Sequence, residues 1–298
     1  MSEKLYLGID GGGSITTAAV CSGCGEIIAV SQGSGINWYS LGIERAKNNL
    51  AEVVKKVCAE AHTEHFDGAF IGMSALAGEA TDEELKNLTD GVICADKIGM
   101  NSDVYIALRA VGSDNCGVII SGTGSMAACF SGGKMYALGG WGYILGDEGS
   151  GYAIGMDGIK AVIASFESRA EQTALTKECL EHFEIGSVEE LIPLFYEKGV
   201  ERSRVASFGG RVCDIAEDGD ELAAKILLRQ AELIAETAAK CFEKISFDSP
   251  VGLWGGISRH SPSFAGFLKE ALSEYGYNNV FVMTAPAYRG ALDAAKEL

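Results

Sequence analysis

Three short strand-like segments open the chain. Apolar and β-branched residues cluster at 5–10, 16–21 and 26–31, and turns separate these runs at Gly11-Gly12-Gly13 and at Ser22-Gly23-Cys24-Gly25. Apolar runs bounded by glycine turns are typical of strands, and connections this short join antiparallel neighbours. The pattern therefore predicts an antiparallel meander.

A helix and further strands are expected next. Apolar positions recur at helical spacing within residues 41–62, and residues 69–73 resemble a buried strand. Thr81, with Glu84 three residues later, has the pattern of a capping box at the start of a helix over 81–88. A short buried strand is predicted at 91–95.

The opening pattern then recurs. Strand-like runs at 117–121, 126–130 and 134–138 are separated by two glycine-containing turns, one at 122–125 and one at 131–133. This repeat is longer than the roughly 20 to 50 residues of a solenoid unit. It instead indicates two similar α/β domains with an interdomain cleft. We place them at residues 1–112 and 113–285, with a C-terminal helix over 286–298 packing on the first.

The second half of the chain is richer in helical periodicity. Helices are predicted at 148–166, 172–182, 188–196, 205–217, 221–245 and 262–275, and strands at 251–254 and 280–283. The second domain is therefore expected to carry helical insertions.

Charge and composition narrow the function. The 298 residues carry a formal charge of −17, with 24 Lys and Arg against 41 Asp and Glu. This balance opposes nucleic-acid binding, because phosphate backbones are held by clustered cations. No run approaches the roughly 18 apolar residues of a membrane span, so no membrane association is expected. Nine scattered cysteines, an odd count, suit a reducing compartment, and we expect a cytoplasmic protein.

The two glycine-rich turns are candidate phosphate sites. Asp10-Gly11-Gly12-Gly13-Ser14 follows a strand directly, and Ser121-Gly122-Thr123-Gly124-Ser125 repeats the arrangement. Glycine turns bring backbone N–H groups close to an anion, although the Walker A spacing is absent and one such turn alone is equally an ordinary hairpin. A carboxylate beside the turn, Asp10, is placed to hold Mg²⁺.

With a third motif, the chain resembles a known family over nearly its whole length. The segments 8–14, 120–125 and Gly139-Gly140-Trp141-Gly142-Tyr143-Ile144-Leu145-Gly146-Asp147-Glu148-Gly149-Ser150-Gly151 are similar to those of N-acetylglucosamine kinases and their BadF/BadG/BcrA/BcrD ATPase relatives. The resemblance implies a duplicated actin-like, ribonuclease H-like α/β fold. It also implies ATP and Mg²⁺ as cofactors, a small amino sugar as partner, and a homodimer.

The resemblance also implies a site. Asp103 would be the catalytic base, and Asp10 the metal ligand. Cofactor-binding positions would be Gly11, Gly12, Gly13, Ser14, Thr16, Gly122, Thr123, Gly124, Ser125, Gly255 and Gly256. Sugar-binding positions would be Asn37, Asp103, Gly140, Trp141 and Asp147. The chain departs from the family pattern at Ser14-Ile15-Thr16, where these kinases commonly have Thr-Lys-Thr.

Structural interpretations compete at several of these positions. Asp103 follows Asn101 and Ser102, and capping a helix is an alternative role for it. Asp147 can act as favourable charge before the next helix, and Trp141 can be a core aromatic. Trp38 is expected to pack beside the site. Asp96 is a second candidate base. Cys21 and Cys24 lack the second pair that a closed zinc site needs.

The expected reaction is ATP-dependent phosphorylation of a hydroxyl, the 6-OH, of an amino sugar. N-acetylglucosamine is the favoured acceptor, with glucosamine and N-acetylmuramate as alternatives. Two other functions within this fold stay open: an ATPase activator of a 2-hydroxyacyl-CoA dehydratase, which needs an iron–sulfur cluster, and a non-catalytic sugar sensor.

Overall fold

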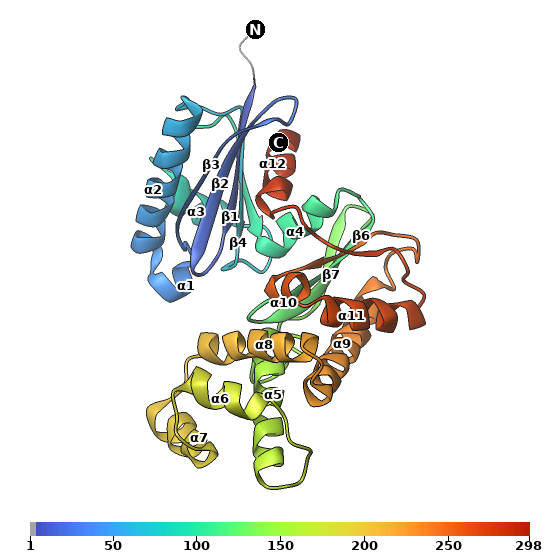
Figure 1. Ribbon diagram of the computed structural model, residues 1–298. Helices are drawn as coiled ribbons and strands as arrows, with labels where there is room; N and C mark the ends of the chain where they lie inside the picture. Colours follow the sequence, from blue (N-terminus) through green and yellow to red (C-terminus); the bar gives the residue numbers. More distant parts are fainter. Residues whose placement is uncertain (1–3) are drawn as a thin grey trace. The chain divides into compact units, whose positions relative to one another are not determined.

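The computed structural model describes residues 4–298, which divide into two compact units. Unit 1 comprises Met1–Ser113 together with Ala285–Leu298, and unit 2 comprises Asp114–Thr284. Each unit is built on a five-stranded mixed sheet with helices packed against it (Figure 1).

The sheet of unit 1 has the strand order β3-β2-β1-β4-β5. The strands are β1 (Leu5–Gly11), β2 (Ile15–Ser22), β3 (Ile27–Ser34), β4 (Gly68–Met73) and β5 (Ile98–Ser102). The first three form the antiparallel meander that the sequence predicts, while β4 and β5 run parallel to β1.

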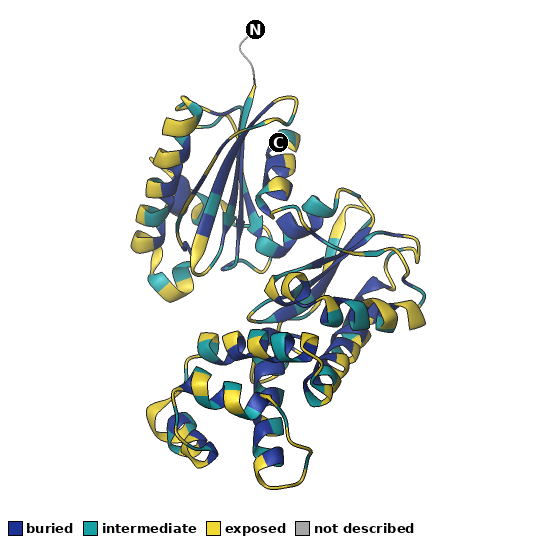
Figure 2. Cartoon of the chain, viewed as in Figure 1, coloured by how far each residue is buried: buried dark blue, intermediate teal, exposed yellow. Residues whose placement is uncertain are grey.

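Helices cover both faces of this sheet. They are α1 (Trp38–Leu41), α2 (Ile43–Ala61), α3 (Asp82–Thr89), α4 (Asp103–Val111) and α12 (Tyr288–Glu297). In Figure 1, α2 lies on one face against β2 and β3, and α12 lies on the other face against β1, β4 and α4. The side of α2 that faces the sheet is buried and its outer side is exposed (Figure 2), as its helical periodicity predicts.

Glycines, which have no side chain, let α12 pack closely against the sheet. A Cβ on Gly8 would lie 2.6 Å from the Leu292 backbone nitrogen, and a Cβ on Gly68 would overlap the Ala295 carbonyl oxygen. Gly290 of α12 contacts the Ile106 carbonyl oxygen of α4 in the same way. The last helix of the chain is therefore an integral layer of unit 1.

The sheet of unit 2 repeats that of unit 1. Its strands are β6 (Cys116–Ser121), β7 (Ser125–Ser131), β8 (Lys134–Gly139), β9 (Val251–Trp254) and β10 (Val280–Val282). Their order, β10-β9-β6-β7-β8, and their directions match unit 1 strand for strand, with β6 in the place of β1. The predicted duplicated α/β fold is thereby confirmed.

Unit 2 differs from unit 1 by its helices. They are α5 (Gly151–Phe166), α6 (Leu175–Phe183), a 3₁₀ turn (Val188–Glu190), α7 (Leu191–Pro193), a π-helical turn (Leu194–Lys198), α8 (Arg202–Glu217), α9 (Glu221–Phe242), α10 (Gly256–His260) and α11 (Pro262–Glu274). Helix α9 covers β7 and β8 as α2 covers β2 and β3. Helices α5 to α8 have no such counterpart and form the predicted insertion.

Several sequence predictions need correction. Residues 91–95 form no strand: Ala95 makes only an isolated bridge to Phe66, and the strand lies at β5. The helix expected at 188–196 is broken into three short turns of different pitch around Pro193, which cannot donate a backbone N–H. Helix α5 begins at Gly151 rather than 148, because Gly149 is left-handed and Ser150 caps the helix.

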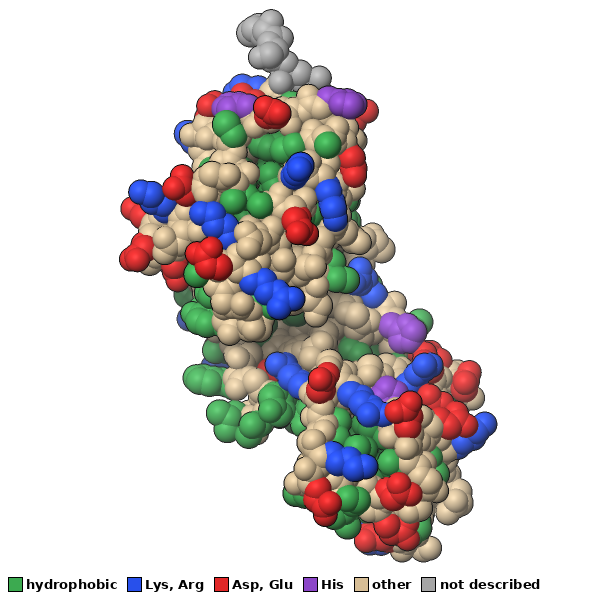
Figure 3. Space-filling model, turned by 90° about the vertical axis from the view of Figure 1, so that its left-hand side faces the viewer, with side chains coloured by type: hydrophobic (Ala, Val, Ile, Leu, Met, Phe, Trp, Pro, Cys, Tyr) green, Lys and Arg blue, Asp and Glu red, His purple; other side chains and the backbone are tan. Residues whose placement is uncertain are grey.

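Surface character agrees with the charge balance of the sequence. On the face of the described residues seen in Figure 3, basic and acidic side chains are interspersed and no basic patch gathers. None of the helices within residues 4–298 has the length and apolarity needed to cross a bilayer.

Candidate functional site

Asp10 lies at the carboxyl end of β1, where the strand register brings other groups beside it. Asp10 pairs with Gly72 of β4, which in turn pairs with Asn101 of β5. Gly72 has no side chain, and Ile106 of α4 fills the space that a Cβ would occupy. Asp103 begins α4 two residues after Asn101. Asp10 and Asp103 therefore lie at the same edge of one sheet.

Asp103 does not cap its helix. The cap is Ser102, whose hydroxyl accepts from the Tyr105 N–H at 3.2 Å, while Asp103 occupies the first helical position. Its Oδ1 accepts from the adjacent Val104 N–H at 2.9 Å. Ser102 and not Asp103 is therefore the cap residue, although one oxygen of Asp103 accepts from an N–H of the first turn.

Both carboxyl groups have raised pKa values. Burial, and secondarily the Asp103 carboxylate, raise the pKa of Asp10 to about 6. Burial also raises the pKa of Asp103, against the lowering effect of the Val104 N–H. Both side chains keep partial exposure, so a ligand can reach them. A pair of carboxyl groups with raised pKa values is suited to binding a cation and to accepting a proton.

The turn after β1 is open on its outer side. The Gly12 N–H donates to the Ile15 carbonyl at 3.0 Å, and a Cβ on Gly13 would have no heavy atom within 4 Å. Gly13 and Ser14 are exposed. This part of the predicted phosphate turn can admit a ligand close to the backbone.

Thr16 lies on the wrong face for a shared site with Asp10. Thr16 pairs with Gly11 and with Gly33, which packs on Val53 of α2, so its fully buried hydroxyl faces the helix α2 side. Thr17 pairs with Asp10 instead and is partly exposed. Strict alternation along β2 was the sequence signal for Thr17, which our sequence prediction missed.

Asn37 connects two loops of unit 1. Its Oδ1 caps α1 by accepting from the N–H groups of Tyr39 (3.0 Å) and Ser40 (3.4 Å). Its Nδ2 donates to the Ser74 hydroxyl at 3.1 Å, and the Ser74 N–H donates to the Gly11 carbonyl at 3.0 Å. Asn37 is thus held close to the end of β1. Trp38 packs partly buried against the core.

In unit 2 the second glycine turn is fastened to the segment 147–151. The Ser121 hydroxyl donates to the Gly149 carbonyl, and the Ser125 hydroxyl donates to the Glu148 carbonyl at 2.6 Å. The Gly151 N–H donates to the Gly122 carbonyl at 2.7 Å. Because the Ser125 proton is donated within the protein, the Thr123 hydroxyl, which is exposed, is the better placed donor for a phosphate.

Asp147 is buried and is held by an ion pair with the partly exposed Arg202. Only 4% of its side chain is exposed, its Oδ2 accepts from Arg202 Nη2 at 2.9 Å, and its Oδ1 accepts from the Gly142 N–H at 3.2 Å. Its backbone has φ of 63°, a left-handed conformation uncommon outside glycine. Helix α5 begins four residues later with Ser150 as its cap, so charge at a helix N-terminus does not account for Asp147. Arg202 was not a sequence candidate.

Apolar side chains around Asp147 are exposed. Trp141 is 75% exposed, so it is no core aromatic, and Ile144 and Leu145 are equally open. Gly140 is exposed with φ of 70°. The segment therefore offers an indole face and a backbone turn beside a fixed carboxylate.

The later glycine pair adjoins the second turn. Gly255 has φ of 120°, and a Cβ there would overlap the Ser121 carbonyl oxygen, whereas Gly256 is exposed and open. Glu217 of α8 holds the junction between α10 and α11. It accepts from the Ser261 hydroxyl (2.9 Å) and from the Ser263 N–H (2.8 Å). The turn and the glycine pair are thus neighbours within unit 2.

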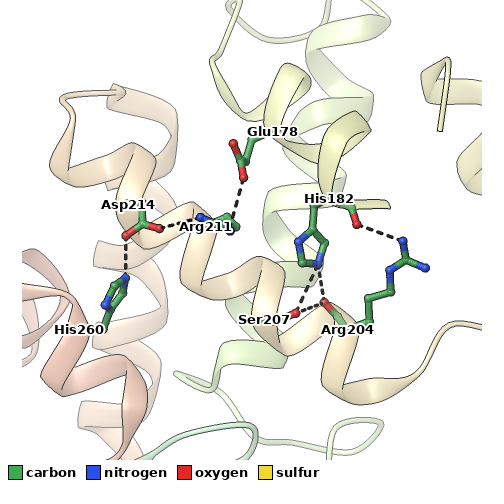
Figure 4. A network of polar contacts seen from close by, with 7 residues as sticks. All are labelled: Glu178, His182, Arg204, Ser207, Arg211, Asp214 and His260. Carbon is green, nitrogen blue, oxygen red and sulfur yellow. Dashed lines mark hydrogen bonds and ion pairs between the residues drawn. The ribbon is translucent and has the colours of Figure 1, made fainter. Parts of the chain in front are cut away.

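Helix α8 carries a polar network that reaches the same helices. In Figure 4, Asp214 lies between His260, at 2.6 Å, and Arg211, which also reaches Glu178 at 3.4 Å. At the other end of the network, His182 contacts the Arg204 carbonyl and the Ser207 hydroxyl. These contacts join α6, α8 and α10 and lend rigidity to the insertion.

Two alternatives from the sequence lose support. Asp96 precedes β5, at the end of the strand opposite to Asp103, and its exposed carboxylate pairs with His65 at 3.1 Å. Cys21 is buried and Cys24 is exposed, and neither forms a disulfide. Within residues 4–298, no group of three or more His, Cys, Asp and Glu side chains is arranged to hold a metal ion.

The donor set at Asp10 fits a hard cation supported by a ligand. Asp10 supplies a carboxylate oxygen, which Mg²⁺ prefers, and Mg²⁺ usually takes only one or two carboxylates plus phosphate oxygens and water. The raised pKa of Asp10 indicates that the folded protein disfavours its negative charge without a cation. Asp10 is therefore a suitable ligand.

Comparison with known proteins gives consistent matches. Residues 7–296 match the model of the BadF/BadG/BcrA/BcrD ATPase family. The chain is 31% identical over 234 residues to an N-acetylmuramic acid/N-acetylglucosamine kinase of Clostridium acetobutylicum, covering 76% of each chain. It is 27% identical over 301 residues to an N-acetyl-D-glucosamine kinase of Dictyostelium discoideum, covering 95% of this chain and 94% of that one. A putative N-acetylglucosamine kinase from Porphyromonas gingivalis shares the fold, with a TM-score of 0.78, 19% identity and 99% of each chain covered.

Proposed function

Because the chain belongs to the BadF/BadG/BcrA/BcrD ATPase family, we propose that it transfers the γ-phosphoryl group of ATP to the 6-hydroxyl of an amino sugar, with N-acetylglucosamine as the preferred acceptor. The observation that carries the proposal is the pair Asp10 and Asp103 at one sheet edge beside an open glycine turn. The kinase names of the two curated relatives support it.

Asp103 acts as the general base. Its ionised carboxylate accepts the proton of the sugar hydroxyl while that oxygen forms a bond to the γ-phosphorus, and the bond from phosphorus to the β,γ-bridging oxygen breaks to release ADP. A base is more effective when its pKa lies closer to the working pH, and burial moves the pKa of Asp103 in that direction. Its freedom from a capping role is consistent with this assignment.

Backbone groups of both turns hold the phosphates. Gly11, Gly13 and Ser14 in unit 1, and Thr123 and Gly124 in unit 2, supply N–H groups and exposed hydroxyls. The N–H groups of Gly12 and Gly122 bond within their own turns, and these two glycines let the backbone approach the phosphates closely. Gly255 and Gly256 border the adenosine. When bound at Asp10, Mg²⁺ would supply charge neutralisation for the phosphates.

The sugar is recognised by Asn37, Asp147, Gly140 and Trp141. The carboxylate of Asp147 accepts hydrogen bonds from sugar hydroxyls, and the exposed indole of Trp141 offers an apolar face to the ring. N-acetylmuramate is the second candidate acceptor, because the Clostridium acetobutylicum relative is named for both sugars.

A panel of acceptors tests the proposal. Purified protein with ATP and Mg²⁺ is given N-acetylglucosamine, glucosamine, N-acetylmannosamine or N-acetylmuramate, and ADP release and product mass are measured. We expect the highest kcat/KM and a phosphate-sized mass gain with N-acetylglucosamine. ADP release that does not depend on any sugar would contradict the proposal.

The cellular setting follows from the same proposal. We propose a cytoplasmic enzyme, since all nine cysteines are free, as is usual in a reducing compartment. The family resemblance also predicts a homodimer. Light scattering on the purified protein measures its mass in solution and so distinguishes a monomer from a dimer.

A further inference from the structure

Arg202 is a firmly held cation beside the second glycine turn, and the proposed mechanism leaves it without a role. It is the first residue of α8 and is delivered there by the helical insertion. Its Nη2 lies 2.9 Å from Asp147 Oδ2 and would lie 2.6 Å from a Cβ on Gly124. Its guanidinium also lies over the Tyr143 ring, 5.3 Å from the centroid.

We propose that Arg202 is a positioning residue of the sugar subsite, which fixes the Asp147 carboxylate and the segment 139–149 in the conformation that accepts sugar hydroxyls. The inference rests on the proposed function. It adds a residue from the insertion, which has no counterpart in unit 1. The insertion thereby acquires a function beyond enlarging the core.

The contacts explain why one arginine can do this. The two oxygens of Asp147 have different partners, Arg202 on one and the Gly142 N–H on the other, so the carboxylate plane is fixed. The guanidinium bridges this carboxylate to Tyr143, whose ring packs on Tyr152 of α5 at 4.7 Å. Arg202 therefore connects the segment to α5 and α8 through charge and ring contacts.

Charge balance gives the proposal a measurable consequence. Burial raises the pKa of Asp147, while Arg202 and the N–H groups of Gly142 and Ser125 lower it, and Glu148 raises it. Loss of Arg202 removes the cation from this set and moves the pKa further up. Because the ionised form accepts the sugar hydroxyls, binding would then be lost at a higher pH than in the wild type.

Arg204 offers a matched control on the same helix. It also pairs with a carboxylate, Glu184 at 3.3 Å, and also lies over a ring, Phe183 at 5.6 Å, but within the insertion. We expect R202M to raise the KM for the sugar about tenfold or more, with kcat changed less than about threefold, as loss of a charge-assisted contact predicts. R204M should leave both unchanged, and R202K should restore part of the loss.

The pH series decides between positioning and mere stabilisation. Sugar affinity is measured by calorimetry, and kcat/KM by ADP release, from pH 5 to 9. As pH falls, the sugar affinity of R202M should be lost about one pH unit above the pH at which wild type and R204M lose it, because one cation is lost from a buried carboxylate. If R202M and R204M have the same pH dependence of sugar affinity and the same KM for the sugar, the inference is overturned.

Failure of the two proposals can be told apart. A wild-type protein that phosphorylates no amino sugar contradicts the proposed function. An active wild type whose R202M and R204M variants behave alike contradicts only the role of Arg202. If circular dichroism shows R202M unfolded, R202K is compared with R204K in the same pH series. The inference is supported if R202K, and not R204K, has a raised KM for the sugar and loses sugar affinity at a higher pH. It is overturned if the two variants behave alike in both measurements.

Discussion

The two glycine-rich turns follow equivalent strands in two sheets of the same order, yet their side chains serve different ends. The first turn follows Asp10, whose carboxylate faces a second acid and stays accessible. The second follows Ser121, whose buried hydroxyl donates a hydrogen bond to the Gly149 carbonyl. Duplication has preserved the backbone. At the strand end unit 1 has a carboxylate, whereas unit 2 has a hydroxyl that holds the segment carrying Asp147.

Among the substitutions considered, Asp103→Asn in unit 1 should give the largest loss of catalytic activity. Removing a general base is expected to lower kcat about a thousandfold, with a smaller change in the KM for the sugar. Steady-state ADP release measures both constants. Asp96→Asn, which alters an exposed acid of the same unit, is the control and should keep full activity. A variant of Asp103 with more than about a tenth of wild-type kcat would remove it from the chemistry.

Asp10→Asn should separate activity from stability. The folded-state pKa of Asp10, about 6, exceeds the unfolded value near 3.8, so its ionisation destabilises the protein as pH rises through this window. At pH 8 the variant should be more stable by about 2–3 kcal/mol, and at pH 4 by only about 0.5 kcal/mol. Urea unfolding at both pH values measures the difference.

Activity of the same variant should fall about a hundredfold, because its amide holds Mg²⁺ poorly. An Asp10→Asn protein that is less stable than wild type at pH 8 would show that the carboxylate is already compensated in the folded state.

Two glycines of the second turn give a matched pair of smaller effects. A Cβ on Gly124 would lie 2.6 Å from Arg202 Nη2 and 2.7 Å from Asp147 Oδ2, whereas a Cβ on Gly122 meets nothing within 4 Å. Gly124→Ala should lower the free energy of unfolding by about 1–3 kcal/mol and raise the KM for the sugar. Gly122→Ala should change stability by less than about 0.5 kcal/mol. Equal effects of the two substitutions on unfolding would refute this view of the turn.

Glu217→Ala should have the smallest effect. Although burial opposes it, hydrogen bonds from Ser263 and Ser261 lower the pKa of Glu217, so its contribution is present near neutral pH and is lost as pH falls through the acid range. The variant should lose about 1 kcal/mol of stability at pH 7, as for one or two lost hydrogen bonds, and almost none at pH 3. Chemical unfolding at the two pH values tests this. A loss that persists at pH 3 would point to lost packing instead.

Much of the fold could be predicted because local signals and periodicity agreed. The meander, its repetition and the capping box at Thr81 each have a distinct pattern in the sequence, and the structure has all three. The predicted strand at 91–95 failed because a short apolar run does not distinguish a strand from a packed loop. The helix at 188–196 failed because periodicity does not report a missing donor at Pro193.

Most of the candidate site was named through the family resemblance and not through local sequence patterns. The approach of Asp103 to Asp10 could not be derived from strand ends, because the strand that ends beside Asp103 was expected at 91–95 and lies at 98–102. Arg202 lies 55 positions after Asp147, on an inserted helix with no spacing rule to connect them. The motif position suggests Thr16 as a ligand, while alternation along the strand places Thr17 beside Asp10.

The position of α12 bears on how this protein is made in the cell. The glycine-lined face of the first sheet is covered by residues 288–297, which leave the ribosome after all of unit 2. During synthesis, Leu292 cannot yet meet Ala19 and Cys21, and that face stays bare while all of unit 2 is translated. Unit 1 is therefore completed only after unit 2 has been made, and a nascent chain stopped before Tyr288 would present an unprotected sheet face to chaperones.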